Sequence, residues 1–227
     1  MQWTEGLKLP LLAAGKHASP DKGLCAMEMV AFIERLPHSD MPECTCRVIG
    51  AFVRGFNDLM TDEERQRLIP YLPLLVGTVS PEHERARGEF AAWKAIKVFA
   101  PLALQDVLPV EAEKLKNFDV SKGLGAAWSA AWSAAYAAAN AAAEGAANAA
   151  KSAAWSAAYA AKSAAESAAN AAWSAAESAA KSAAESAAKR SQIISTAFDL
   201  INEMLAIGPK GAFTKDPQAV KTLLAVL

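Results

Sequence analysis

Glu28 is the residue whose surroundings in the sequence point most directly to chemistry. It is the only charged side chain between Lys22 and Glu34, inside an otherwise apolar run. A helix of such neighbours would bury the carboxylate, which must then be paired or take up a proton. Glu28 is therefore a candidate general acid–base group or metal ligand. The structural alternatives are an ion pair with Arg47 or Arg54, or a place on an exposed strip.

A group of potential metal ligands follows shortly after this run. His38, Asp40 and Cys44 have side chains of the types that bind zinc. Glu28 or His17 would be a further ligand if the chain brought them together. These residues form a candidate metal site, although nothing in the sequence identifies a particular metal or cofactor.

The spacing of this group also has a simpler structural explanation. Cys-x-Cys replaces the usual Cys-x2-Cys of zinc sites, and on a helix Cys44 and Cys46 would point roughly 200° apart. Asp40 lies where the N-cap of a helix beginning at Pro42 is expected. Cys46 would then be a small core residue.

A polar cluster forms if the first two helices pack antiparallel. Asn57 and Asp58 end an apolar helix, where they suit turn chemistry, and Arg54 pairs with Asp58 at a spacing of four residues. Together with the residues above, they would suit a small, polar, nucleotide-like ligand. The candidate ligand-binding residues are Glu28, His38, Asp40, Arg54, Asn57 and Asp58.

The helices that position these residues are marked by caps and prolines. Ser19-Pro20 predicts a helix through residue 33, Pro42 a second, and Thr61 with Glu64 forms a capping box for a third. Ser80-Pro81 begins a longer helix. No segment alternates with period two for long enough to predict a strand.

The second half of the chain is an alanine-rich repeat. Residues 126–189 consist of Ala-Ala pairs separated by one larger residue, without proline, which predicts helix throughout. The pattern favours one long helix slightly over a hairpin turning near Gly145. A hairpin would place Trp132 opposite Tyr159 and Tyr136 opposite Trp155. The stripe of Trp128, Trp132 and Tyr136 is expected to dock this helix on a core rather than to stack on a ligand.

The alanine face needs a partner, because alanine-lined helices gain mainly close dispersion contacts. Another copy of the chain is the partner we expect, which makes the protein a homo-oligomer.

After the repeat, the sequence predicts an amphipathic helix whose apolar face is suited to the hydrophobic core. The residues of this face are Ile193, Ile194, Ala197, Phe198, Ile201, Met204 and Leu205.

The bulk composition limits the classes of partner. The chain has 227 residues and a formal net charge of -1, which argues against general nucleic-acid binding. No segment of about 20 strongly apolar residues predicts a membrane span. Three cysteines and no recognisable export signal predict a cytoplasmic protein.

Together these patterns predict an all-α protein. It would have a compact helical head, residues 1–122 plus 191–227, and a long Ala-rich helix or helical hairpin extension, residues 123–190. The function we expect is non-enzymatic binding or assembly, with self-association through the Ala-rich helix. The alternative is a small polar ligand or metal-binding protein, including a hydrolase, with its site in the head. No phosphate loop, metalloprotease motif or nucleophile elbow is present.

Several motifs in the head also suggest a family resemblance. They are Gly23-Leu24-Cys25-Ala26-Met27-Glu28, His38-Ser39-Asp40-Met41-Pro42-Glu43-Cys44, Phe52 through Asn57-Asp58, and Gly77-Thr78. With the Ala-rich segment and closing amphipathic helix, they resemble an uncharacterised family of bacterial and bacteriophage proteins. The resemblance implies a bacteriophage or mobile-element setting as readily as a host one, and it transfers no activity and no catalytic residue.

Overall fold

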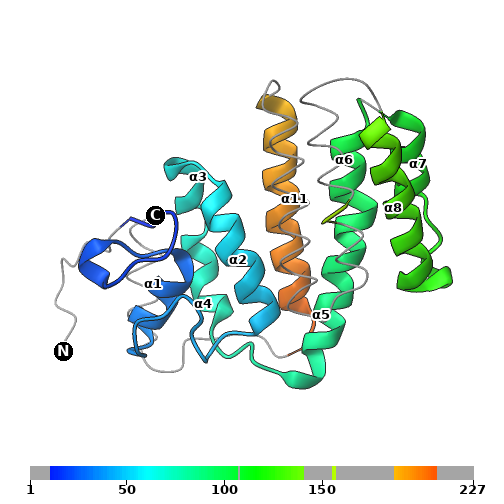
Figure 1. Ribbon diagram of the computed structural model, residues 1–227. Helices are drawn as coiled ribbons and strands as arrows, with labels where there is room; N and C mark the ends of the chain where they lie inside the picture. Colours follow the sequence, from blue (N-terminus) through cyan, green and yellow to red (C-terminus); the bar gives the residue numbers. More distant parts are fainter. Residues whose placement is uncertain (1–10, 107, 141–154, 157–186, 209–227) are drawn as a thin grey trace. The chain divides into compact units, whose positions relative to one another are not determined.

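The computed structural model describes residues 11–106, 108–140, 155–156 and 187–208. Within these ranges the regular structure is helical and no sheet forms (Figure 1). A single parallel β-bridge between Leu12 and Leu24 is the only strand-like pairing among the described residues. The all-α class predicted from the sequence is therefore confirmed.

The chain divides into two compact units. Unit 1 comprises Met1–Ser80 with Gly208–Leu227, and unit 2 comprises Pro81–Ile207. The predicted separation of a head from an extension at residues 123–190 concerns a segment that lies largely outside the described residues. That boundary therefore stays a prediction.

Unit 1 is a set of short helices. In α1 and α2 an almost wholly buried run of residues forms the core, and α1 packs against α2 and α4. The rings of Phe52 and Phe56 are stacked with centroids 5.9 Å apart. The elements are η1 (Pro20–Lys22), α1 (Ala26–Ile33), α2 (Arg47–Leu59), α3 (Asp62–Gln66), η2 (Ile69–Tyr71) and α4 (Leu72–Leu75).

The first two long helices begin later than the proline signals predict. Pro20 opens only a 3-10 turn, and α1 starts after Cys25, whose sulfur accepts the Glu28 amide hydrogen at 3.4 Å. Pro42 lies in a turn closed by a bond from Thr45, and α2 begins at Arg47. The start of α1 is fixed by a local capping box, because the Glu28 carboxylate also accepts from the Cys25 amide at 2.8 Å. At α2 a distant partner takes this role, since the Cys46 amide donates to the Thr78 hydroxyl at 3.0 Å.

The third helix begins where the sequence predicts. The Thr61 hydroxyl accepts from the Glu64 amide at 3.2 Å, and the Glu64 carboxylate accepts from the Thr61 amide at 2.9 Å. This capping box is reciprocal and local, so it forms without help from the rest of the fold. The helix is short, and the chain continues as separate turns through Pro70 and Pro73.

Unit 2 is built from longer helices. Its elements are α5 (Pro81–Lys94), the π-helix η3 (Ala95–Phe99), α6 (Ala100–Leu104), α7 (Pro109–Lys116), η4 (Val120–Lys122), α8 (Gly123–Asn140) and α11 (Ala187–Ala206). The widened turn of η3 ends just before Pro101, which has no amide hydrogen to donate to a normal helical acceptor. The Ala100 amide instead donates to the carbonyl of Ala95.

The closing helix α11 provides the core stripe predicted for it. It packs against α5, and its predicted apolar residues are all buried: Ile193, Ile194, Ala197, Phe198, Ile201, Met204 and Leu205. Its C-terminus is capped from α5 by the fully buried Arg87, whose Nε donates to the carbonyls of Met204 at 3.1 Å and Ile207 at 2.9 Å. A cation is favoured there by the helix dipole as well as by these bonds.

The first helix of the Ala-rich repeat buries its alanine face within a single chain. Ala127, Ala131 and Ala134 of α8 are 0% exposed, and α7 and η4 pack against this helix. The exposed side carries Ser129 and Ser133, whose hydroxyls donate to carbonyls of the preceding turn. In this part of the repeat, the face that was expected to need another copy is already covered.

Two tryptophans of the repeat are in direct contact. The ring centroids of Trp132 and Trp155 are 4.3 Å apart, whereas a straight helix would hold residues 23 positions apart at about 35 Å. The contact contradicts one straight helix through both residues, which the pattern had slightly favoured. It is also not the pairing of the predicted hairpin, which placed Tyr136 opposite Trp155. Gly145 and the side chains of Trp128, Tyr136 and Tyr159 lie outside what the structure describes.

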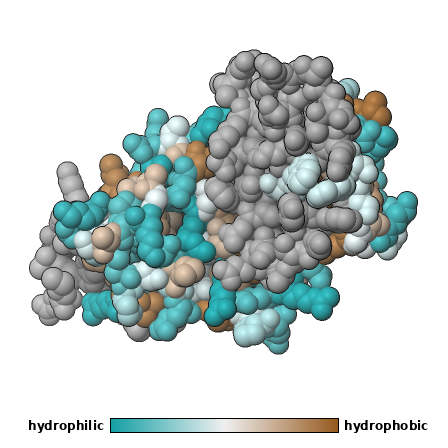
Figure 2. Space-filling view, in the orientation of Figure 1, coloured by the Kyte–Doolittle hydropathy of each residue, from teal (hydrophilic) through white to brown (hydrophobic). Residues whose placement is uncertain are grey.

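The surface of the described residues mixes polar and apolar side chains. On the face shown in Figure 2, hydrophobic residues are interspersed with hydrophilic ones. The large hydrophobic side chains with most exposure are Leu11, Met41, Leu74, Val79, Val110 and Val120. Among the described helices, none is both long enough and apolar enough to cross a bilayer.

Candidate functional site

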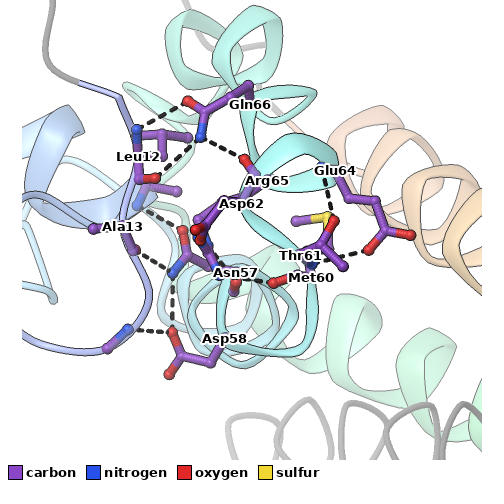
Figure 3. Close-up of polar contacts among 12 residues, drawn as sticks. Leu12, Ala13, Asn57, Asp58, Met60, Thr61, Asp62, Glu64, Arg65 and Gln66 are labelled. Atoms are coloured by element: carbon purple, nitrogen blue, oxygen red, sulfur yellow. Dashed lines mark hydrogen bonds and ion pairs between the residues drawn. The ribbon is translucent and has the colours of Figure 1, made fainter.

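The polar residues predicted to bind a ligand come together in unit 1, around a segment of the chain itself. We call residues 12–17, which precede η1, the strap. We call the surface that holds it the cradle, defined by Glu28 of α1, Asn57 and Asp58 of α2, and Gln66 of α3. Figure 3 shows the part of this contact made by α2 and α3.

The strap is held at its first residue by a two-way amide clamp. The Gln66 side chain accepts from the Leu12 amide at 2.9 Å and donates to the Leu12 carbonyl at 3.0 Å (Figure 3). The Leu12 side chain is buried, and the next residue, Ala13, donates to the Leu24 carbonyl. Gln66 therefore binds backbone atoms of the strap, and these bonds would be available with most residue types at position 12.

Asn57 and Asp58 continue the same backbone recognition. The fully buried Asn57 amide donates to the Ala13 carbonyl at 2.9 Å, and its oxygen accepts from the Ala26 amide at 3.1 Å. Asn57 also donates to Asp58, whose Oδ1 accepts from the Gly15 amide at 2.7 Å. One side-chain pair thus fixes two points of the strap and the start of α1.

Glu28, which is fully buried, binds the last residue of the strap. Its Oε1 accepts from the His17 amide at 2.7 Å, and its Oε2 accepts from the Cys25 amide and lies 2.8 Å from His17 Nδ1. Burial by itself raises the pKa of the Glu28 carboxyl, but the bonds from Cys25 and His17 outweigh burial and lower that pKa below its ordinary 4.5. Glu28 is therefore an ionised, hydrogen-bonded carboxylate at neutral pH.

The two histidines beside Glu28 have tautomers assigned by their partners. His38 Nε2 lies 2.9 Å from the His17 carbonyl oxygen, which can only accept, so this nitrogen carries hydrogen; it also lies 3.6 Å from Glu28 Oε1. His17 Nδ1 faces an ionised carboxylate and donates to it. In neutral His17 the acceptor nitrogen is therefore Nε2.

The remaining predicted residues support the strap from its outer side. Arg54 donates to the Asp40 carbonyl at 3.1 Å, and the Asp40 carboxylate lies 3.1 Å from Lys16 Nζ. The Lys16 side chain is 69% exposed, so this ion pair adds little stability. Glu28 takes its partners from His17, Cys25 and His38, and the alternative of an ion pair with Arg47 or Arg54 is replaced by these contacts.

The three predicted metal ligands are not brought together. His38 turns to Glu28 and His17, Asp40 pairs with Lys16, and Cys44 Sγ lies 3.9 Å from its neighbour Thr45. Among the described residues, no three His, Cys, Asp or Glu side chains are grouped to hold a metal ion. Burial also raises the pKa of Cys44, and that of Cys25 to about 12, which disfavours the thiolate that binds metals.

A glycine next to the site is required by His17. Gly23 has φ of 132°, and a Cβ placed on it would lie 2.6 Å from the His17 ring. Both the backbone angle and the close approach of the imidazole exclude larger residues. Gly23 therefore belongs to the site, although the sequence signals it only as a glycine near a helix start.

Sequence reasoning did not assign Gln66 or Arg65 to the site. Arg65 is buried and donates to the carbonyls of Asn57 at 2.9 Å and Met60 at 2.7 Å, so it caps the end of α2 where the cradle begins. Its third bond goes to Asp62. In sequence these residues are an ordinary polar stretch of a charged helix, and only the fold reveals their partners.

The site as a whole binds the backbone of the strap, which bends at Ala14 and Gly15. Each cradle residue contacts an amide or a carbonyl of the strap, and most of the polar capacity of the cluster is used in this way. The Glu28–His17 pair has the geometry of a carboxylate that orients an imidazole, which is also found in general bases and in metal sites.

Comparison of the chain with protein-family models, with curated proteins and with solved structures finds no match in any of the three.

Proposed function

We propose that the protein is a non-enzymatic helical binding or assembly protein of the cytoplasm that self-associates through its Ala-rich repeat. The contact between Trp132 and Trp155 carries the proposal. The two tryptophans occupy the same position in two identical heptapeptides, Ala-Ala-Trp-Ser-Ala-Ala-Tyr, at residues 130–136 and 153–159. The repeat is therefore complementary to itself.

Self-complementarity within a chain extends naturally to contacts between chains. A second copy presents the same heptapeptides, and tryptophan provides a large contact area while alanine lets helices approach closely. Because Ala127, Ala131 and Ala134 are buried within one chain, association would use other units of the repeat. One such unit is Ala-Ala-Trp-Ser at residues 171–174.

The non-enzymatic part of the proposal is supported by the use of the polar cluster. Glu28, Asn57 and Asp58, which were the strongest candidates for chemistry, bind the backbone of the strap. Three free cysteines, Cys25, Cys44 and Cys46, agree with a reducing compartment.

The experiment is a light-scattering mass measurement on the full chain over a range of concentrations. We expect a multiple of 23.9 kDa, and a smaller mass for Trp173→Ala. Trp3→Ala is the matched control, because it removes a tryptophan outside the repeat. A monomer mass at every concentration, with helical circular dichroism retained, would contradict self-association.

A second candidate function rests on His17. Its imidazole is oriented by the ionised Glu28, which leaves Nε2 as an acceptor or ligand atom for a small polar molecule or metal ion. Calorimetric titration with Zn²⁺ and with nucleotides tests this candidate. Binding that is lost in His17→Ala and kept in His83→Ala would favour it, and no heat change in any titration would exclude it for these ligands.

A further inference from the structure

The cradle in unit 1 recognises the strap almost entirely through the backbone. The Leu12 amide and carbonyl bind Gln66, the Ala13 carbonyl binds Asn57, and the amides of Gly15 and His17 bind Asp58 and Glu28. The distances run from 2.7 to 3.0 Å. None of these bonds requires the strap to belong to the same chain as the cradle.

The linker between the strap and α1 has few contacts that tie it to the fold. Ala18, Pro20, Asp21 and Lys22 are exposed. Within the part of the chain that the structure describes, Lys22 bonds only to Ser19 and Asp21, its neighbours in the same turn. Ser19 is extended and makes no side-chain cap bond. An exposed linker that is held only locally is the usual hinge of a segment exchange.

We propose that the cradle is a docking site for the strap of a second copy, so that two copies exchange residues 12–17. A second copy is the occupant that fits best, because it supplies the same segment with the same bonds, and exchange needs no new contact. This surface is in unit 1 and is independent of the Ala-rich repeat. It adds a second way for copies to join, beyond the function proposed above.

The main test removes the linker from the full chain by deleting residues 18–22, which joins His17 directly to Gly23. The strap then loses the turn through η1 that leads it back to its own cradle, but it can still bind the cradle of another copy. We expect a dimer mass by light scattering, with the amides of Gly15 and His17 still protected from hydrogen exchange. A monomer, or a dimer in which these amides exchange freely, would overturn the proposal.

A second substitution separates this contact from the repeat. In the shortened chain, Asn57→Leu removes the bonds to Ala13 and Ala26. The exchanged dimer should then be lost, and the mass measured by light scattering should fall. Trp173→Ala should leave the exchanged dimer intact. If the dimer survives Asn57→Leu, or is lost only with Trp173→Ala, association runs through the repeat and strap exchange is wrong.

A peptide experiment on the intact chain guards against misfolding of the shortened variant. A fluorescent peptide of residues 11–18 is added to the full-length protein and its anisotropy is followed. We expect saturable binding at high micromolar to millimolar concentration, since the covalently attached strap competes. The same titration with Asn57→Leu should show at least a ten-fold weaker response. No saturable binding to the intact chain, or equal binding to both proteins, would overturn the proposal.

Discussion

The side chain of Asn57 donates to the carbonyl of Ala13 at 2.9 Å and accepts from the amide of Ala26 at 3.1 Å. One buried amide on α2 therefore joins the strap to the first turn of α1. Residues that are 44 and 31 positions from Asn57 in sequence meet at a single side chain. The stability of unit 1 should depend on it strongly.

Asn57→Leu should lower the free energy of unfolding of unit 1 by about 2–4 kcal/mol, because it leaves the buried amide hydrogen of Ala26 and the partly buried carbonyl of Ala13 without this partner. Urea denaturation measures the change. Asn117→Leu is the matched control, since Asn117 is exposed and its side chain donates to Glu113, one turn away. Equal effects of the two substitutions would contradict the role given to Asn57.

Acid should weaken unit 1 through Glu28. Its pKa in the folded state lies below the ordinary 4.5, so the stabilisation it provides is complete above pH 4.5 and is lost as the pH falls through the folded-state pKa. In Glu28→Gln this part of the acid dependence should disappear. The substitution should also lower stability at pH 7 by about 1–3 kcal/mol, because an amide accepts fewer of the bonds from His17 and Cys25.

Denaturant titrations at pH 7 and at several values below 4.5 compare the two proteins. Glu82→Gln, in the first turn of α5 with a side chain that is 80% exposed, is the control for loss of a carboxylate. A wild-type stability that does not fall in acid, or an equal fall in Glu28→Gln, would show that Glu28 is not the titrating group.

Gly23→Ala should destabilise unit 1 by about 1–3 kcal/mol, because an alanine at φ of 132° is strained and its Cβ would press on the His17 ring. Gly125→Ala provides the opposite control. Gly125 lies in helix α8 with nothing within 4 Å of an added Cβ, so the substitution should stabilise by about 0.5–1 kcal/mol. Thermal unfolding would show shifts of opposite sign, and a neutral Gly23→Ala would refute the His17 contact.

Arg87→Met should destabilise unit 2 by about 2–4 kcal/mol, because the carbonyls of Met204 and Ile207 lose their buried donor at the end of α11. Arg85→Met, on the same helix, is the control. Arg85 is exposed and pairs with Glu89 one turn away, so we expect no measurable change. Faster hydrogen exchange near the end of α11 in Arg87→Met, but not in Arg85→Met, would confirm the cap.

Local features of the sequence were sufficient for much of the fold. The capping box of Thr61 and Glu64 forms as predicted, because both partners lie within one turn. The apolar stripe of α11 is buried at each predicted position, since the period of a helix turns spacing directly into a face. Both signals need only a few neighbouring residues to act.

The candidate site was predictable in part. The sequence selected Glu28 because a charge in an apolar run must find partners, and it grouped Asn57 and Asp58 with it. It did not identify what these residues bind, because the strap is held by Gln66 from 54 positions away and by backbone groups that carry no sequence signal. The alternative of an ion pair with Arg47 or Arg54 also depended on geometry that the sequence does not contain.

The sequence by itself therefore determined that the chain is helical, which faces of its helices are apolar, and that Glu28 lies in an apolar run where burial would require partners for its carboxylate. Only the tertiary structure decided that Arg87 caps a helix more than 100 positions away, that Trp132 meets Trp155, and that the polar cluster encloses residues 12–17. The physical reason for this difference is the sequence separation over which each interaction acts. Helix propensity and capping act between near neighbours, whereas buried hydrogen-bond partners are fixed only when distant segments meet and exclude water.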